Sequence, residues 1–151
     1  MPTPTTLTEL LENNRRVARS ITYLEGENDE RSVSYAELYQ RALGILYRLQ
    51  KLGAKRGDKL ILFLGNNEQF IDAFWAAVLG GIVPVPVAIG ISDEHRHKLL
   101  RIARKLGDPF IYTERKSLDR IGAFAAQHPE EAETFNRLQA RAFLVDDLED
   151  I

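Results

Sequence analysis

Apolar residues along this chain follow two spacings, one typical of helices and one typical of buried strands. Behind Ser34 they recur every three or four positions, which predicts an amphipathic helix over residues 35–52. Residues 59–64 (KLILFL) form instead a nearly continuous apolar run between turn residues. Such a run is typical of a strand that is buried on both faces of a parallel sheet. The pattern therefore predicts a helix followed by a central buried strand.

The next two segments extend this pattern. Asn66 can cap a helix whose residues 70–79 are apolar on almost every side, so we expect this helix, with Trp75, to be deeply buried. Residues 82–87 (IVPVPV) predict a strand at a sheet edge or one with interrupted pairing, because Pro84 and Pro86 have no amide hydrogen to donate. The other predicted elements are a hairpin of residues 21–24 and 31–34, helices over 7–14, 92–106, 118–127 and 129–140, and strands over 110–112 and 142–145.

Strands that alternate with helices at this spacing predict an α/β fold. We expect a mostly parallel sheet with helices on both faces and right-handed crossovers. A chain of 151 residues is long enough for one such domain with a sizeable core. No repeat or low-complexity tract interrupts the sequence, so we expect one folding unit.

Composition excludes several classes of function. The formal net charge of -2 gives no bulk attraction to nucleic acid or to an anionic membrane. The chain contains no cysteine, which removes disulfides, thiolate metal sites and cysteine nucleophiles. The N-terminus lacks the pattern of a secretory signal, and no apolar run reaches the roughly eighteen residues that a membrane span needs. We therefore expect a cytoplasmic protein.

The candidate binding residues lie in one turn. Residues 65–67 (GNN) come between a predicted strand and a predicted helix, which is the edge where ligands bind in open α/β sheets. Asn66 and Asn67 are therefore the candidate substrate-binding residues, and capping of the helix by Asn66 is the competing explanation. The turn has neither the glycine spacing nor the lysine of a phosphate loop.

No pattern in the sequence predicts a catalytic residue or a metal site. His95 and His97 are two residues apart on a predicted helix and so point to different faces. His128, next to Pro129, is expected in a loop or cap. The chain has no nucleophile elbow, no HExxH and no Walker lysine.

Two segments resemble motifs of a known superfamily. Residues 33–38 (VSYAEL) and 78–88 (VLGGIVPVPVA) resemble, in this order and separation, the first two core motifs of adenylate-forming enzymes. This superfamily includes acyl-CoA synthetases, fatty acyl-AMP ligases and the adenylation domains of peptide synthetases. The resemblance covers roughly residues 22–151 and implies the N-terminal subdomain of the adenylate-forming fold. It places no catalytic residue on either motif, and it implies that Asn66 helps to shape the substrate side of the domain.

The resemblance also implies an activity for the parent enzyme. Such an enzyme activates a carboxylic acid as an acyl-AMP and passes the acyl group to a phosphopantetheine thiol. ATP and Mg²⁺ are implied for the parent, but the residues that hold them in this family lie downstream, so no cofactor is expected within this chain. We expect residues 1–151 to be the N-terminal segment of an AMP-binding domain, truncated before the phosphate loop and inactive alone. The VPVPV form is closer to fatty acyl-AMP ligases, which makes a fatty acid the expected substrate.

Two alternatives stay open. One is an amino-acid adenylation domain of a peptide synthetase, although such domains usually carry an aspartate after the corresponding prolines. The other is a complete, non-catalytic flavodoxin-like domain that binds a partner or a small ligand. A strictly monomeric chain without a large apolar patch would favour this second alternative.

The expected partners follow from the same interpretation. They are the rest of the parent enzyme and an acyl carrier domain. The local basic residues are most simply a solvated face, and contact with a carrier or an adjoining domain is their alternative role; they are Arg101, Arg104, Lys105, Arg115 and Lys116. A truncated domain exposes a strand edge and apolar helix faces, so we also expect self-association of the chain, most simply as a homodimer.

Overall fold

The computed structural model describes residues 6–9, 20–24, 30–89 and 92–145. In chain order the elements are β1 (Ser20–Leu24), β2 (Glu30–Ser34), α2 (Tyr35–Lys51), β3 (Lys59–Phe63), α3 (Asn67–Leu79), β4 (Val83–Pro86), α4 (Asp93–Leu106), β5 (Phe110–Thr113), α5 (Arg115–Gln127), the 3₁₀ helix η1 (Pro129–Glu131), α6 (Ala132–Ala140) and β6 (Ala142–Leu144). β1 and β2 form an antiparallel hairpin, and the other strands form a parallel sheet in the order β4-β3-β5-β6.

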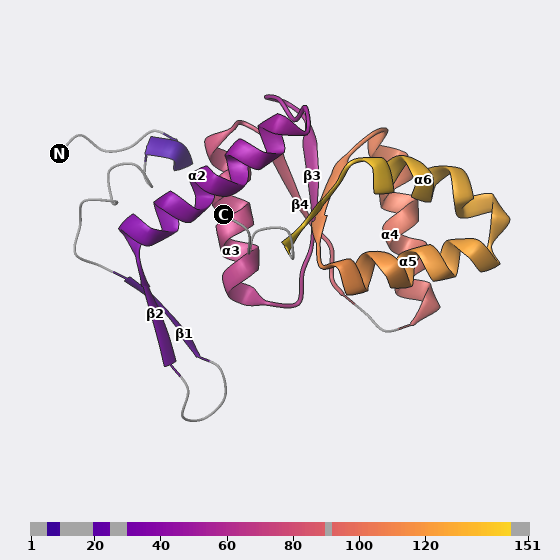
Figure 1. Ribbon diagram of the computed structural model, residues 1–151, viewed down its shortest axis with the longest axis horizontal. Coiled ribbons are helices and arrows are strands. Elements are labelled where there is room, and N and C mark those ends of the chain that lie inside the picture. The colour runs from indigo at the N-terminus through magenta and orange to yellow at the C-terminus, as the bar shows by residue number, and fades with distance from the viewer. Residues whose placement is uncertain (1–5, 10–19, 25–29, 90–91, 146–151) are drawn as a thin grey trace.

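Helices cover both faces of the parallel sheet, as the sequence predicts (Figure 1). α2 and α3 pack over one face, and α4, α5 and α6 pack over the other. Side chains of β3 alternate between these layers: Leu60 and Leu62 belong to the core beneath α2 and α3, while Ile61 and Phe63 belong to the core beneath α4, α5 and α6. All four are buried, which confirms β3 as an interior strand.

β4 lies at the edge of the sheet, as its two prolines predict. Pro84 and Pro86 align with Leu60 and Leu62 of β3. The amides of Val83 and Val87 donate toward β3, to the carbonyls of residues 58 and 62 at 2.8 and 3.1 Å. Because alternate residues of a strand direct their polar groups to the same side, the two prolines lie on the outer side. That side offers carbonyls but no N–H, so this edge cannot extend the sheet into a second copy by regular pairing.

Helix termini agree with the sequence in most places. Ser34 Oγ accepts a hydrogen bond from the Glu37 amide at 3.1 Å, and Gly53, just after α2, has a φ of 99°. Thr6 Oγ1 accepts from the Glu9 amide at 3.0 Å at the start of a helical turn, while residues 10–14 of the predicted first helix lie outside the described residues. One boundary is wrong, because α5 begins at Arg115 rather than at residue 118. The side chain of its N-cap residue makes no capping bond, so the usual starting signal is absent.

α3 differs most from expectation. Its inner face is closely packed through three fully buried alanines, at positions 73, 76 and 77. Trp75, on the outer side, is only half-buried and meets Phe74 edge to face at 5.7 Å between ring centroids. The expectation of a fully buried Trp75 is therefore wrong for the described structure. The sheet and α2 cover the inner face of the helix, and the hairpin covers part of the other face through Ile71 and Trp75.

Candidate functional site

The candidate site lies at the carboxyl edge of the parallel sheet. From β3 the chain first adds β4 on one side and then β5 on the other, so the strand order reverses between β3 and β5. The helices that follow these two strands, α3 and α5, lie on opposite faces of the sheet (Figure 1). Ligands of open α/β sheets bind at such a reversal point. The turn at residues 65–67 lies there, as the sequence predicts.

A buried threonine joins the two strands at this point. Thr113, the last residue of β5, donates from Oγ1 to the Phe63 carbonyl at the end of β3, at 2.7 Å. Thr113 is fully buried, so the hydroxyl satisfies a carbonyl that water cannot reach. This bond holds the ends of β3 and β5 together just before their following turns diverge.

The two candidate asparagines have different environments. Asn66 Oδ1 accepts a hydrogen bond from the Gln69 amide at 3.0 Å, so Asn66 caps α3. Asn67 is the first residue of α3 and is exposed. Both line a hollow of about 330 Å³, whose lining residues are Tyr23, Leu24, Gly65, Asn66, Asn67 and Glu68. The structure therefore confirms the capping role of Asn66 and also places both side chains at a polar concavity.

An ion-pair cluster fixes the first turns of α3 behind this hollow. Arg41 of α2 donates from Nη1 to Glu68 Oε1, and the same nitrogen lies 3.5 Å from Asp72 Oδ2. Both carboxylates are buried, while Arg41 is partly exposed. Burial alone would lower the pKa of Arg41, but the bond to Glu68 and the charges of Asp72 and Glu68 outweigh it and raise that pKa. Arg41 therefore stays charged, and its ion pairs tie the candidate turn to α2.

Most of the chain matches a known protein family. The family model described as AMP-binding enzyme matches residues 11–139. The chain belongs to the AMP-binding enzyme family. The resemblance that the two sequence motifs suggest is thus confirmed.

Relatives of this chain include two solved structures and a curated sequence. The McyG A-PCP protein, complexed with phenylalanyl-adenylate, is 32% identical with a TM-score of 0.80, over 98% of this chain and 26% of that one. An adenylation domain of a keto acid-selecting NRPS module, bound to keto acyl adenylate, is 27% identical with a TM-score of 0.81, over 95% and 27%. A Mycobacterium tuberculosis protein named as fatty-acid–CoA ligase fadD25 is 20% identical over 115 residues, which are 74% of this chain and 20% of the relative.

The two solved structures confirm the fold of the chain as that of the first part of an adenylation domain. The chain spans about a fifth of the length of the curated relative and about a quarter of the solved chains. No helix among the described residues is long and apolar enough to cross a membrane.

The histidines and several basic residues of the chain lie away from the candidate turn. His95 Nδ1 meets Ser92 Oγ at 2.5 Å, and His128 Nδ1 lies 2.9 Å from the Phe124 carbonyl, so both serve local structure. Glu131, fully buried, accepts from Arg104 Nη2 at 2.6 Å and lies 3.5 Å from His97 Nδ1. Arg104 is therefore an ion-pair partner and not simply part of a solvated face, as the sequence had suggested.

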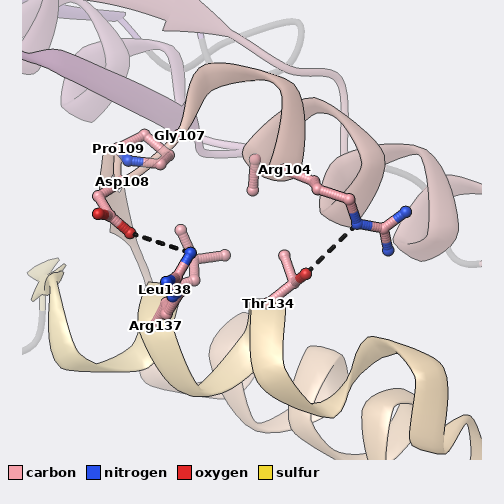
Figure 2. A pocket seen from close by; sticks show the side chains of 8 residues that line it. Arg104, Gly107, Asp108, Pro109, Thr134, Arg137 and Leu138 are labelled. Atoms are coloured by element: carbon pink, nitrogen blue, oxygen red, sulfur yellow. Dashed lines mark hydrogen bonds and ion pairs between the residues drawn. The ribbon is translucent and has the colours of Figure 1, made fainter.

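A second concavity lies between the carboxyl end of α4 and α6 (Figure 2). In it Arg104 Nε is 3.5 Å from Thr134 Oγ1, and Arg137 faces Asp108 at 3.9 Å. Its volume is about 60 Å³, room for about two waters. This groove is too small to hold an acyl adenylate.

The described residues of the chain do not by themselves fit ATP or Mg²⁺. They contain no group of three histidine or carboxylate side chains that could hold a metal ion. At the candidate turn, the residues that line the hollow include the carboxylate of Glu68 and no lysine or arginine that could meet a phosphate. We therefore assign no step of phosphate chemistry to these residues.

Sequence reasoning missed two parts of this site. Arg41, Glu68 and Asp72 carried no recognised motif, although two acids four residues apart on an otherwise apolar helix are a usable signal of an inward ion pair. Tyr23 and Leu24 come from the hairpin, and only the packing of β1 against α3 brings them beside residues 65–67.

Proposed function

We propose that this chain is the N-terminal part of the large domain of an ATP-dependent acid-activating ligase. In the proposed reaction a carboxylate oxygen attacks the α-phosphorus of ATP, pyrophosphate leaves, and an acyl-AMP results. A phosphopantetheine thiol then attacks the acyl carbon and AMP leaves. The role of this chain is to supply one sheet layer and the turn at residues 65–67, while the groups that act on phosphate lie elsewhere in the protein.

One observation carries this proposal. Nearly the whole chain, 98% of it, superposes on an adenylation protein solved with phenylalanyl-adenylate, with a TM-score of 0.80 and 32% identity. The family match over residues 11–139 supports the same conclusion from sequence alone. The strand order of the sheet is compatible with the flavodoxin-like alternative. That alternative, however, explains neither the structural match nor the family match.

A fatty acid is the first candidate substrate. The VPVPV segment at residues 83–87 lacks the aspartate that is usual in amino-acid adenylation domains, and a curated relative is named as a fatty-acid–CoA ligase. An amino or keto acid is the second candidate, since two solved relatives hold phenylalanyl-adenylate and keto acyl adenylate. A thiol on a carrier domain is the candidate acceptor of the acyl group. The A-PCP relative supports this choice.

Acid-dependent exchange of labelled pyrophosphate into ATP tests the proposal. The complete protein that contains these residues is assayed with fatty acids of increasing length, with amino acids including phenylalanine, and with 2-keto acids. We expect exchange with a fatty acid. Exchange only with an amino or keto acid would replace the substrate assignment, and no exchange with any acid would contradict the proposal.

Two further assays test which part of the protein activates the acid and which group accepts the acyl group. The 151-residue chain alone is expected to give no exchange, because it holds no phosphate loop; exchange above a no-enzyme control would show that its own residues suffice. Acyl transfer is then compared between a carrier domain with its phosphopantetheine arm and the same domain without it. Labelling of both would argue against a thiol acceptor.

A further inference from the structure

All strands of the parallel sheet begin at one edge, which we call the amino edge. It lies at the top of Figure 1, opposite the turn at residues 65–67. Three segments lead into β3, β5 and β6 there, residues 52–59, 105–109 and 137–141. They contain two acids and six cations, although acids exceed cations in the chain as a whole; the cations are Lys55, Arg56, Lys59, Lys105, Arg137 and Arg141. The amino edge is therefore a positively charged face of an acidic chain.

Helix dipoles account for only part of this charge. Helices of a parallel α/β fold end where the strands begin, and cations stabilise the partial negative charge of a helix C-terminus. Lys105 and Arg137 lie in the last turns of α4 and α6 and have this role. Lys55, Arg56 and Lys59 lie outside the helices, and none of them forms an ion pair with another described residue. The helix dipoles therefore do not explain these three cations.

The turn before β3 presents its cations in a fixed arrangement. Asp58 Oδ2 accepts a hydrogen bond from the Lys55 amide at 2.9 Å, which closes the turn and engages the one acid of residues 52–59. The stem of Arg56 lies over Gly81, where a Cβ would come within 2.8 Å of Arg56 Cγ. Side chains that are already positioned lose less conformational entropy on binding, which favours a docking surface over a solvated face.

The groove of Figure 2 is also part of the amino edge. Arg104, Thr134 and Arg137 line it and supply N–H and O–H donors. Its one lining acid, Asp108, is 3.9 Å from Arg137 Nη1, which is too long for a hydrogen bond, so the guanidinium keeps donors for a ligand. A volume of about 60 Å³ admits a flat carboxylate but not a phosphate with its ester groups. The groove therefore selects a carboxylate side chain over a lipid or nucleic-acid phosphate.

The edge strand β4 limits the form of the partner. Its outer side offers no N–H at Pro84 and Pro86, so a partner cannot add to it as a regular strand. Leu52, in the first segment, and Val83, which aligns with Lys59, are 47% and 46% exposed and offer apolar contacts beside the cations. An acidic helix that also carries apolar side chains meets both conditions.

We propose that the amino edge binds an acidic helix of a partner protein and that the groove between α4 and α6 receives one of its carboxylates. Because this edge lies opposite the turn at residues 65–67, such a partner leaves the candidate site open. The inference goes beyond the proposed function and does not depend on it. An anionic membrane and a nucleic acid are the competing partners of a basic surface.

Peptide binding to the complete protein tests the proposal. The probe is a fluorescent synthetic helix of about twelve residues, with Glu and Leu on one face, and the control peptide has Gln in place of each Glu. We expect anisotropy titrations to show at least about tenfold tighter binding of the Glu peptide, and a smaller difference at high salt, which screens exposed charges. Vesicles of phosphatidylcholine with phosphatidylserine and a DNA duplex are titrated in parallel.

Variants locate the binding surface. Arg56→Gln and Arg137→Gln should each weaken binding of the Glu peptide by about fivefold, as expected for one exposed ion pair. Arg120→Gln makes the same change at an exposed position of α5 and should weaken binding by less than about twofold. Asp108→Asn removes the acid that competes for Arg137 and should tighten binding. Circular dichroism checks the fold of each variant, and Arg56→Gln carries the test if Arg137→Gln does not fold.

Four results would overturn the proposal. Equal binding of the two peptides would show that the edge does not select acids. Equal effects of Arg120→Gln and Arg137→Gln would show that net charge, and not this edge, attracts the peptide. Weaker binding by Asp108→Asn would mean that the groove does not receive the carboxylate. Tighter binding of vesicles or DNA than of the Glu peptide would assign the edge to that partner. Peptide binding needs no catalytic activity, so each result holds whether or not the protein exchanges pyrophosphate.

Discussion

Two helices on opposite faces of the sheet, α3 and α4, place charge in opposite directions. On α4 the exposed face carries cations, among them Lys98, Arg101 and Lys105, above fully buried leucines at 99 and 100. On α3 the acids Glu68 and Asp72 face Arg41 on the inside, and half-buried apolar side chains, among them Phe74 and Trp75, lie on the outside. The outer face of α4 is therefore suited to contact with water, while the outer face of α3 has the character of an interior surface.

Each layer also contains a buried carboxylate cluster, and the clusters differ in which partner can reach solvent. Between α2 and α3, two buried carboxylates share one arginine, Arg41. Between α4 and η1, one buried carboxylate, Glu131, is held by Arg104 and His97, whose side chains are 53% and 45% exposed. Losing a partner should cost more where the remaining charge stays buried.

The largest expected effect tests whether the two cores are equal beneath this difference. Leu62→Ala removes contacts under α2 and α3, and Ile61→Ala removes contacts under α4, α5 and α6; both residues are fully buried. We expect each to lower the free energy of unfolding by about 2 to 5 kcal/mol in urea titrations, through lost contacts and a residual cavity. A cost for Leu62→Ala near zero would show that the α2–α3 side is not a formed core, and the comparison would fail.

Arg41→Ala is expected to come next. It leaves Glu68 and Asp72 buried without their shared cation, which should cost about 2 to 4 kcal/mol, below the full value for a buried pair because Arg41 is partly exposed. Arg101→Ala on α4 removes the same type of side chain from an exposed position and should change stability by less than about 0.5 kcal/mol. Equal effects of the two variants would remove the distinction between inward and outward charge.

The sequence predicts the elements of both layers but not what separates them. Periodicity and caps place α2, β3 and β4, and the missing amides of Pro84 and Pro86 correctly predict the sheet edge. The apolar pattern of α3 predicts full burial, which is correct for its inner face only, because a pattern shows which faces are apolar and not which of them the neighbouring elements cover.

For the candidate site, strand-to-helix order was enough to place Asn66 and Asn67 at the carboxyl edge. The contribution of Tyr23 and the identity of Arg41 as the partner of the two acids could not be predicted. Both depend on long-range packing, of the hairpin against α3 and of α2 against α3. A helix pattern in one segment carries no information about its partner in another.

Glu131→Ala is expected to cost less than Arg41→Ala. Arg104 and His97 are largely exposed and can be hydrated when the carboxylate is removed, so the loss is mainly the hydrogen bond and the packing, about 1 to 2 kcal/mol. The same urea titrations, run beside Glu133→Ala as an exposed control on α6, measure it. A cost above that of Arg41→Ala would mean that partner exposure does not decide the energetics of these clusters.

The smallest effect at neutral pH concerns Tyr112, on the α2–α3 side of the sheet. Burial of its ring, which stacks on Phe143, and the charge of Asp72 raise the pKa of this phenol, and Arg48 opposes them only in part. Below pH 10 the phenol is protonated in both states and adds no pH dependence. Above that pH the unfolded chain loses the proton while the folded protein keeps it, so the free energy of unfolding falls as pH rises, by up to about 1.4 kcal/mol per pH unit.

Tyr112→Phe should therefore change stability little at neutral pH and flatten the alkaline decline, whereas Tyr47→Phe, at an exposed position, should keep the wild-type slope. Urea midpoints measured on both sides of pH 10 decide this, and identical slopes for Tyr112→Phe and the wild type would show that the phenol is not held in its neutral form by this side of the sheet.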